Sequence, residues 1–357
     1  MKDPFPIPPI PALSAAVQPW ADYFNLPTLP LHIHEILLIA AFYQFVFSVV
    51  SPLLSSYLFP AQYAALSGSK RLNWNVHVVS FVQSTTINIL ALWVMYADQE
   101  RKQMDWQERL WGYTGAAAMI QALAAGYFLW DLFVTAANVN IFGLGMLAHA
   151  ISALLVYSFG FRPFVNYYSC NFILWELSSP FLNIHWFFDK LGMTGSRAQL
   201  YNGLVLIATF FSCRLVWGTY QSVLVGYDIW AGIHSNPSMP AAVDADKFDD
   251  SIFSPQYTHT MQFASTSTGV PLWLAAIYMG SNLTLNSLNF YWFFKMIEAV
   301  RKRFDVKAES KEEVDMLHKL DADGTAIVAT GTDEGIQTRP RRRTILDGED
   351  ADAPPPI

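Results

Sequence analysis

The sequence is poor in cysteine, with two among its 357 residues, Cys170 and Cys213. Both lie inside apolar segments, where a cysteine most simply acts as a small packing residue. Two such residues provide neither a disulfide framework nor the ligands of a zinc site. We therefore expect no bound metal.

Charged residues are also scarce, at 14% of the chain against 53% hydrophobic residues. Long windows contain almost no charge, whereas the C-terminal region is dense with it. This composition excludes an ordinary soluble protein and favours a membrane protein. The formal net charge of -7 belongs mainly to the tail and to a loop near residues 228–250, so it gives no reason to expect a nucleic-acid partner.

Common nucleotide-binding and metalloenzyme motifs are missing too. The sequence contains no P-loop, no dinucleotide-binding fingerprint and no HExxH motif, so no cofactor is expected. Residues 1–30 are rich in proline but contain no continuous apolar stretch, which is unlike a cleaved signal peptide. Targeting is therefore expected to depend on the first membrane span.

The sequence does contain a series of apolar runs of about twenty residues, the length of a membrane-spanning helix. Seven such runs occur, at residues 34–58, 74–97, 111–135, 142–161, 165–188, 200–225 and 269–297. They predict an all-α polytopic membrane protein with about seven transmembrane helices.

These runs also suggest how the chain is organised. A Pro-rich segment at 1–33 precedes the first transmembrane helix at 34–58, and a larger domain follows at 70–297. A long loop at 226–268, with several prolines and aspartates, interrupts this domain and is expected to lie at the surface.

Two charged segments follow the last span. Residues 298–320 predict a basic, amphipathic helix beside the membrane, and residues 321–357 predict a disordered tail. With seven spans, lysine and arginine are more numerous on the side of the membrane that holds the C-terminus. That bias predicts a cytoplasmic C-terminus.

Ionisable side chains inside a span are costly in lipid and are therefore candidates for a functional site. Asp131 lies near the end of the third span and His149 near the start of the fourth, at similar depth on one side of the membrane. A carboxylate beside an imidazole fixes its tautomer and makes it a competent base or nucleophile. A hydrogen bond that only joins two helices is the alternative, and spacing does not separate the two.

A second polar group comes from the fifth and sixth spans. Glu176, Ser179 and Asn183 occur at spacings of three and four, which places them on one helix face. Arg214 lies near the centre of the sixth span and is expected to pair with Glu176 or Asp131. This pairing is either functional or purely structural.

Other spans carry polar residues as well. Pro180 predicts a kink in the fifth span, and Gln83 and Asn202 add polar surface to the second and sixth. One face of the seventh span carries a stripe of asparagines, Asn282, Asn286 and Asn289. The stripe suits either a polar lumen or helix packing, and the Asn282 sequon is not expected to be glycosylated inside a span.

Five strings in this order resemble the TLC domain family, across roughly residues 70–297. They are LNWNVHVVSFVQ at 72–83, GYFLWDL at 126–132, LAHAISALLVYS at 147–158, FILWELSSPFLNIHWFF at 172–188 and YNGLVLIATFFSCR at 201–214. The TLC-domain-only branch is the most similar. The resemblance implies an endomembrane protein, most often of the endoplasmic reticulum, with six core helices around a tunnel that admits a lipid or acyl chain.

Ceramide synthases of this family carry a His-His pair that transfers an acyl group from acyl-CoA to a sphingoid base. The corresponding pair here is Ala148-His149, so the first histidine is missing, and Gln83 stands where relatives tend to have another. The resemblance therefore implies a protein of lipid homeostasis that binds a membrane lipid or acyl chain. The expected tunnel-lining residues are Gln83, Asp131, His149, Glu176, Ser179, Asn183, Asn202 and Arg214.

Two further functions remain open. An acyl-CoA-dependent acyltransferase would use His149 as its base or nucleophile and Asp131 as the group that orients it. A transporter or channel would need a continuous polar path, and the charged residues form no repeated or inverted pattern that would support one.

Overall fold

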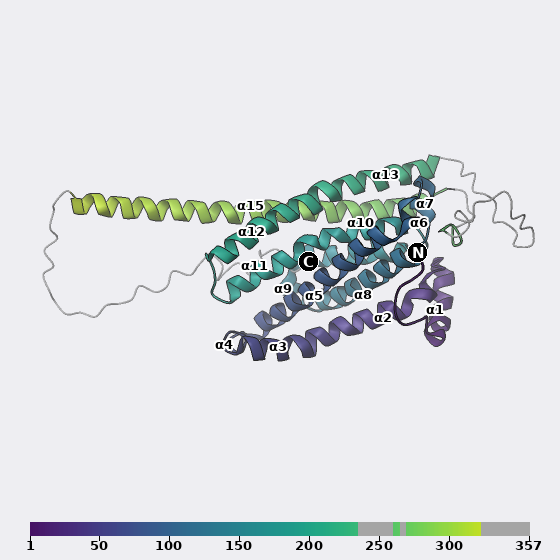
Figure 1. Ribbon diagram of the computed structural model, residues 1–357, viewed down its shortest axis with the longest axis horizontal. Coiled ribbons are helices and arrows are strands. Elements are labelled where there is room, and N and C mark those ends of the chain that lie inside the picture. Colours follow the sequence, from purple (N-terminus) through teal and green to yellow (C-terminus); the bar gives the residue numbers. More distant parts are fainter. Residues whose placement is uncertain (235–259, 265–268, 323–357) are drawn as a thin grey trace, which may run out of the picture. The chain divides into compact units, whose positions relative to one another are not determined.

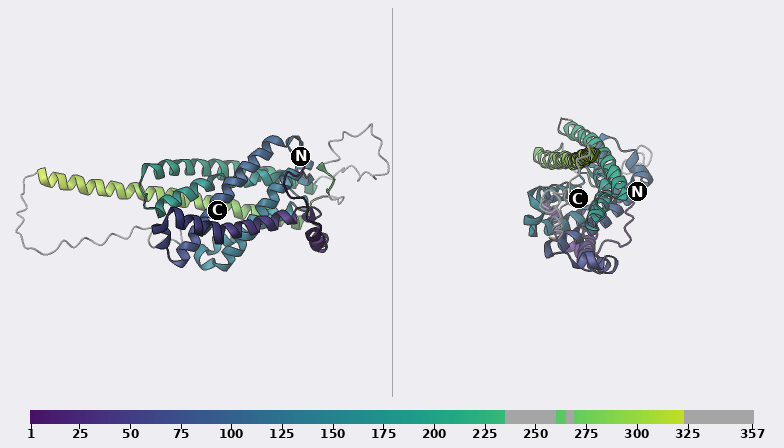
Figure 2. Two further views of the ribbon diagram at one scale, coloured as in Figure 1. Left: turned by 60° about the horizontal axis from the view of Figure 1, so that its bottom comes forward. Right: turned by 90° about the vertical axis from the view of Figure 1, so that its left-hand side faces the viewer.

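The computed structural model describes residues 1–234, 260–264 and 269–322, with side chains to residue 302. Within these ranges the chain is helical and contains no strand, which confirms the predicted all-α class. The chain forms two compact units, and the second begins at Tyr291. Figure 1 and Figure 2 show the helices of the first unit running beside one another.

The Pro-rich N-terminal segment is largely helical, which the sequence analysis did not predict. It contains helix α1 (Pro11–Phe24), and α2 (Leu29–Phe45) begins with Pro30 in its first turn. A π-helical stretch, η1 (Val46–Val50), joins α2 to α3 (Ser51–Leu58), and α4 (Pro60–Ala64) follows. The helix predicted at 34–58 is present but starts at Leu29, because proline is tolerated at the start of a helix.

Helix α8 (Gly115–Ala137) packs against α2, α5 (Gly68–Ala97) and α9 (Val139–Phe159). Its alanine-rich sequence allows close approach between helices, as is common in membranes. A Cβ atom added at Gly126 would lie 2.7 Å from the carbonyl oxygen of Ile36 on α2. Short helices α6 (Gln99–Lys102) and α7 (Trp106–Trp111) connect α5 to α8.

The fifth predicted span is helical but not one regular helix. It consists of η2 (Asn166–Tyr168), α10 (Ser169–Ile173), the 3₁₀ segment η3 (Leu174–Ser178) and α11 (Ser179–Lys190). Pro180 lies in the first turn of α11, so the predicted kink is a change from 3₁₀ to α geometry directly before the proline.

The last helices contain a second π-helical stretch. Helix α12 (Arg197–Phe210) continues through η4 (Phe211–Trp217) into α13 (Gly218–His234), and α15 (Leu272–Ala322) follows. Since α13 extends to His234, the loop predicted to start at 226 starts later; most of it lies outside the described residues. The predicted helix at 298–320 is the continuation of α15, and the tail beyond Ala322 also lies outside the description.

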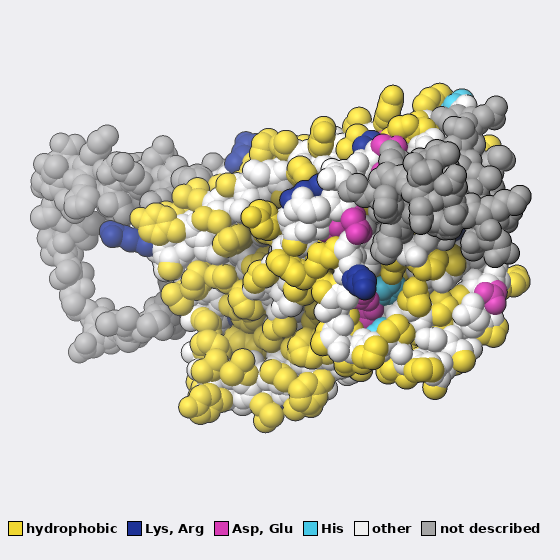
Figure 3. All heavy atoms as spheres, turned by 45° about the vertical axis from the view of Figure 1, so that its right-hand side comes forward, with side chains coloured by type: hydrophobic (Ala, Val, Ile, Leu, Met, Phe, Trp, Pro, Cys, Tyr) yellow, Lys and Arg dark blue, Asp and Glu magenta, His cyan; other side chains and the backbone are white. Residues whose placement is uncertain are grey.

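Five helical segments among the described residues are long and apolar enough to cross a membrane. They are Leu29–Leu58, Gly68–Ala97, Trp106–Ala137, Val139–Phe159 and Arg197–His234. Figure 3 shows hydrophobic side chains over much of the face it draws, as a lipid-facing surface requires. The chain is therefore a polytopic all-α membrane protein, and the count of seven spans stays a prediction.

Candidate functional site

Two irregular helical segments contact each other inside the first unit. The 3₁₀ segment η3 carries Glu176 and Ser178 and ends next to Ser179, while the π-helical segment η4 carries Arg214. Short π-helical stretches inside helices occur frequently at functional sites. Here the two irregularities direct polar side chains from the fifth and sixth predicted spans toward each other.

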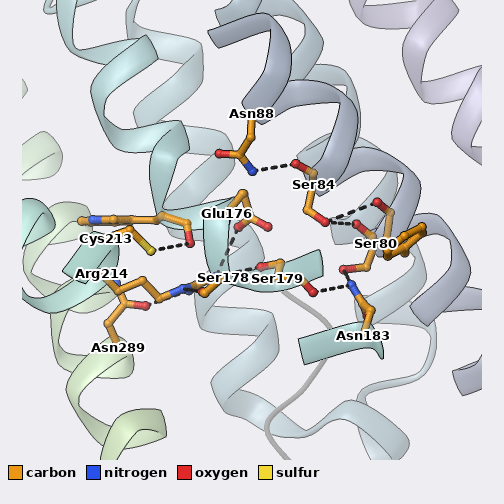
Figure 4. A network of polar contacts seen from close by, with 12 residues as sticks. Ser80, Ser84, Asn88, Glu176, Ser178, Ser179, Asn183, Cys213, Arg214 and Asn289 are labelled. Carbon is orange, nitrogen blue, oxygen red and sulfur yellow. Dashed lines mark hydrogen bonds and ion pairs between the residues drawn. The ribbon is translucent and has the colours of Figure 1, made fainter. Parts of the chain in front are cut away.

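Arg214 is the centre of these contacts, and its side chain is 2% exposed. Its Nε donates to Ser178 Oγ at 3.0 Å, its Nη2 to Ser179 Oγ at 3.0 Å, and its Nη1 to Asn289 Oδ1 on α15 at 2.9 Å. Nη2 also lies 3.7 Å from Glu176 Oε1. The predicted pairing of Arg214 with Glu176 is therefore confirmed, and Figure 4 shows the contacts.

A second set of hydrogen bonds links Ser179 to α5. The Asn183 side-chain amide donates to the Ser179 carbonyl oxygen at 2.9 Å and to Ser80 Oγ at 3.0 Å. Asn183 Oδ1 lies 2.8 Å from His77 Nδ1, and the His77 ring stacks on Trp186 with 3.9 Å between ring centroids. Polar contacts thus run from η4 through η3 and α11 to α5.

Gln83 lies three residues after Ser80, so the two side chains share one face of α5. We call the following residues the buried polar centre: His77, Ser80, Gln83, Glu176, Ser178, Ser179, Asn183, Arg214 and Asn289. Figure 4 shows Ser80, Ser84 and Asn88 of α5 on the side that faces Glu176.

Several polar atoms of this centre are buried without a hydrogen-bond partner in the part of the chain that the structure describes. They are Gln83 Oε1, Gln83 Nε2, Glu176 Oε2 and Asn289 Nδ2. A buried polar atom without a partner costs about 1–3 kcal/mol, so such atoms are rare and often mark functional sites. The orphaned atoms include both donors and acceptors.

The predicted pair of Asp131 and His149 lies on α8 and α9, and both side chains are buried. Asp131 accepts a hydrogen bond from Thr135 at 3.3 Å and is within electrostatic reach of Glu176. The His149 ring meets Phe128 edge-on at 5.9 Å and is within electrostatic reach of Arg214. Both residues are thus buried on two helices that pack together, and their predicted role as a pair stays a prediction.

Asn202 and the asparagine stripe make contacts between helices. Asn202 is half-buried and donates to the Phe181 carbonyl oxygen at 2.8 Å, which joins α12 to α11. Asn286 donates to Ser222 Oγ on α13 at 2.8 Å and to Asn282. Asn289, the third asparagine of the stripe, accepts a hydrogen bond from Arg214. Because these asparagines join one helix to another, their contacts favour the helix-packing interpretation of the stripe.

The sequence prediction missed His77, Ser80 and Ser178 in this centre. A sequence pattern that indicates His77 and Ser80 was present, because His77, Ser80 and Ser84 recur at helical spacing on one face of α5. Ser178 carried no such signal, because its direction depends on the 3₁₀ geometry of η3. A further group of ionisable residues, Asp3, His32 and Glu35, was also missed.

A lipid tunnel is not confirmed by the cavities. Among the described residues, one cavity of about 10 Å³, room for about one water molecule, is lined by Gln121, Val156, Tyr157, Gly160, Val165, Tyr168, Ser169, Phe172 and Tyr278. Ligand pockets generally measure about 300–1,000 Å³. The tunnel therefore stays a prediction.

The fold and the site define the class as a polytopic helical membrane protein with a polar centre enclosed by its helices. The model of the TLC domain matches residues 73–298. An uncharacterized TLC domain-containing protein of Schizosaccharomyces pombe is 38% identical over 292 residues, covering 82% of this chain and 87% of that protein. The chain belongs to the TLC domain family, which confirms the resemblance seen in the sequence.

Other relatives agree with this assignment. Topoisomerase I damage affected protein 4 of Saccharomyces cerevisiae is 28% identical over 277 residues, covering 76% of this chain and 85% of that protein. Human TLC domain-containing protein 4 is 32% identical over 176 residues, covering 48% of this chain and 65% of that protein.

Proposed function

We propose that this protein binds a membrane lipid or its acyl chain at the buried polar centre and thereby influences membrane lipid composition. The observation that carries the proposal is the set of orphaned polar atoms on Gln83, Glu176 and Asn289. A buried polar group is unfavourable unless a partner satisfies it. A lipid that places a polar linkage beside these atoms supplies that partner, and its chains match the apolar helices around it.

The orphaned atoms also favour a particular lipid chemistry. Gln83 Nε2 and Asn289 Nδ2 are donors and require an acceptor, such as an ester or amide carbonyl. Gln83 Oε1 and Glu176 Oε2 are acceptors and require a donor, such as a hydroxyl or an amide N–H. A lipid backbone with both a carbonyl and a hydroxyl or amide N–H meets both requirements.

An acyltransferase is the second candidate, and the position of His149 favours it. His149 is buried beside Phe128 and within electrostatic reach of Arg214. In such a reaction the imidazole attacks the acyl-CoA thioester, the carbon–sulfur bond breaks, and the CoA thiolate takes the imidazole proton. The acyl group then passes to an acceptor, with Asp131 orienting the ring.

The experiment that tests lipid binding is native mass spectrometry of the purified protein, with lipid extraction and quantification. Wild type is expected to retain lipid. Gln83→Leu replaces the orphaned amide with an apolar side chain of similar volume, and we expect about tenfold less retained lipid, as for the loss of hydrogen bonds to a buried ligand. The matched control is Gln18→Leu, which changes an exposed glutamine on α1 and should leave retention unchanged.

Absence of lipid from the wild-type protein would overturn the proposal, and so would equal retention by wild type and Gln83→Leu. The enzyme candidate is tested by incubation with acyl-CoA. An acylated protein or product that forms with wild type and is absent with His149→Ala supports it. If wild type forms neither, the acyltransferase candidate is rejected while lipid binding stands on its own result.

We also propose residence in the endoplasmic reticulum membrane with a cytoplasmic C-terminus. The charge bias of the predicted loops supports this orientation. Protease treatment of sealed microsomes is expected to remove a C-terminal epitope tag. Full protection of that tag in microsomes that remain sealed would show the opposite orientation.

A further inference from the structure

Three ionisable side chains meet where α2 begins, away from the residues named for lipid binding. His32 Nδ1 lies 2.6 Å from Glu35 Oε1 and 3.4 Å from Asp3 Oδ2. One ligand atom from each of the three residues lies within 4.8 Å of the others. The spacing of three between His32 and Glu35 places both on one face of α2.

The contacts among these three side chains leave part of the Glu35 carboxylate without a partner. Two carboxylates face one imidazole nitrogen, and Glu35 is completely buried. In the described part of the chain, the ion-pair partners of both carboxylates are histidines, His32 and His34, rather than lysine or arginine. Glu35 Oε2 also has no hydrogen-bond partner there, so an acceptor is buried beside the cluster without a donor.

The other nitrogen of His32 is already held. His32 Nε2 lies 2.8 Å from the Tyr113 hydroxyl, in the segment between α7 and α8. Metal-binding histidines typically use one ring nitrogen for the ion and a hydrogen bond at the other, which fixes the tautomer and the ring orientation. The Tyr113 contact therefore leaves Nδ1 directed at the two carboxylates.

We propose that Asp3, His32 and Glu35 bind a divalent transition metal ion. One imidazole nitrogen and carboxylate oxygens are ligands of Zn²⁺, Mn²⁺ and Fe²⁺, whereas Mg²⁺ and Ca²⁺ prefer oxygen ligands alone. The ion balances the negative charges of the two carboxylates and gives Glu35 Oε2, which lacks a hydrogen-bond donor, a partner. Asp3 is 28% exposed, which gives the ion access from solvent.

The expected consequence of this ion is structural. It ties residue 3 to α2, and through Tyr113 to the segment that precedes α8. Because the ion binds the folded state, free metal should raise thermal stability in a concentration-dependent way. Metal binding at this site does not require lipid binding at the buried polar centre. It differs from the expectation, drawn from the low cysteine content, that the protein binds no metal.

The test uses the full chain, purified in detergent, stripped with chelator and dialysed against Zn²⁺ and then against metal-free buffer. Elemental mass spectrometry is expected to find about one zinc per wild-type chain, and less than about one-tenth in Asp3→Asn and His32→Gln. Tyr113→Phe keeps the ligands but removes the contact to Nε2, and should lower zinc affinity about 10–100-fold. His234→Gln changes an exposed histidine and should bind zinc as wild type does.

A measurement on the wild type keeps the test independent of how the variants fold. X-ray absorption of the zinc-loaded protein should show nitrogen and oxygen ligands at about 2.0–2.2 Å and no sulfur. The proposal is overturned if wild type retains no zinc after dialysis, because a site with these ligands binds Zn²⁺ more tightly than Mn²⁺ or Fe²⁺. It is equally overturned if Asp3→Asn and His32→Gln both retain as much metal as wild type, or if sulfur ligands appear.

Discussion

Arg214 of the π-helical segment η4 and Glu176 of the 3₁₀ segment η3 form a buried ion pair, with 3.7 Å between Nη2 and Oε1. The guanidinium also donates to Ser178, Ser179 and Asn289. A charge in the apolar part of a membrane protein is tolerated when other groups pair with it. The pair therefore supports the fold whether or not a lipid binds beside it.

Removing the positive charge should be strongly destabilising. Arg214→Met leaves Glu176 buried without its ion-pair partner and removes three hydrogen bonds. We expect a loss of about 3–5 kcal/mol in the free energy of unfolding, the usual cost of breaking a buried pair from one side. Thermal unfolding in detergent, followed by tryptophan fluorescence, measures the change.

Two further variants control this prediction. Arg197→Met removes an exposed arginine at the start of α12 and should leave the melting temperature nearly unchanged. The double variant Arg214→Met with Glu176→Leu should be less destabilised than the sum of its single changes, because no lone charge remains buried. Additive losses would contradict the ion pair.

A double-mutant cycle should find coupling between His77 and Asn183, whose side chains are 2.8 Å apart. Removing either one leaves a polar atom of the other buried without its partner. We expect a coupling energy of about 0.5–3 kcal/mol for His77→Leu combined with Asn183→Leu, measured from unfolding free energies. The same cycle between His77 and Asn282, which is in no contact with it that the structure records, should give a value near zero.

Two glycines inside helices should respond in opposite ways to alanine. A Cβ atom at Gly218 overlaps the indole of the buried Trp175, whereas a Cβ at Gly280 meets nothing within 4 Å. Gly218→Ala should destabilise by about 1–3 kcal/mol through overpacking. Gly280→Ala should stabilise by about 0.5–1 kcal/mol through helix propensity. Melting temperatures that move in the same direction would contradict the packing of Trp175 against η4 and α13.

The Asn282 sequon should remain unmodified in eukaryotic cells. Asn282 is 3% exposed on α15, and its side chain contacts Asn286. Glycosidase treatment should not change the mobility of the protein on a gel, and Asn282→Gln should migrate as wild type does. A glycosidase-sensitive band that Asn282→Gln lacks would place Asn282 outside the membrane.

The sequence predicted much of the fold because membrane helices have a strong local signal. Long apolar runs located five helices that meet the length and hydropathy requirements, and five strings identified the family. The ends of the segments were less predictable. Helix α1 and the early start of α2 were missed, because proline weakens a helical pattern although it fits the first turn.

The sequence by itself determined that this is an all-α membrane protein of the TLC domain family, and that a charge such as Arg214 inside a span requires a partner. Only the tertiary structure decided that Glu176 is that partner and that serines and Asn289 share the guanidinium. Only it brought Asp3 to His32 and Glu35. The reason is physical: hydropathy and helix spacing act within one segment, whereas a 3₁₀ turn, a π-helical stretch and the packing of distant segments decide which side chains meet.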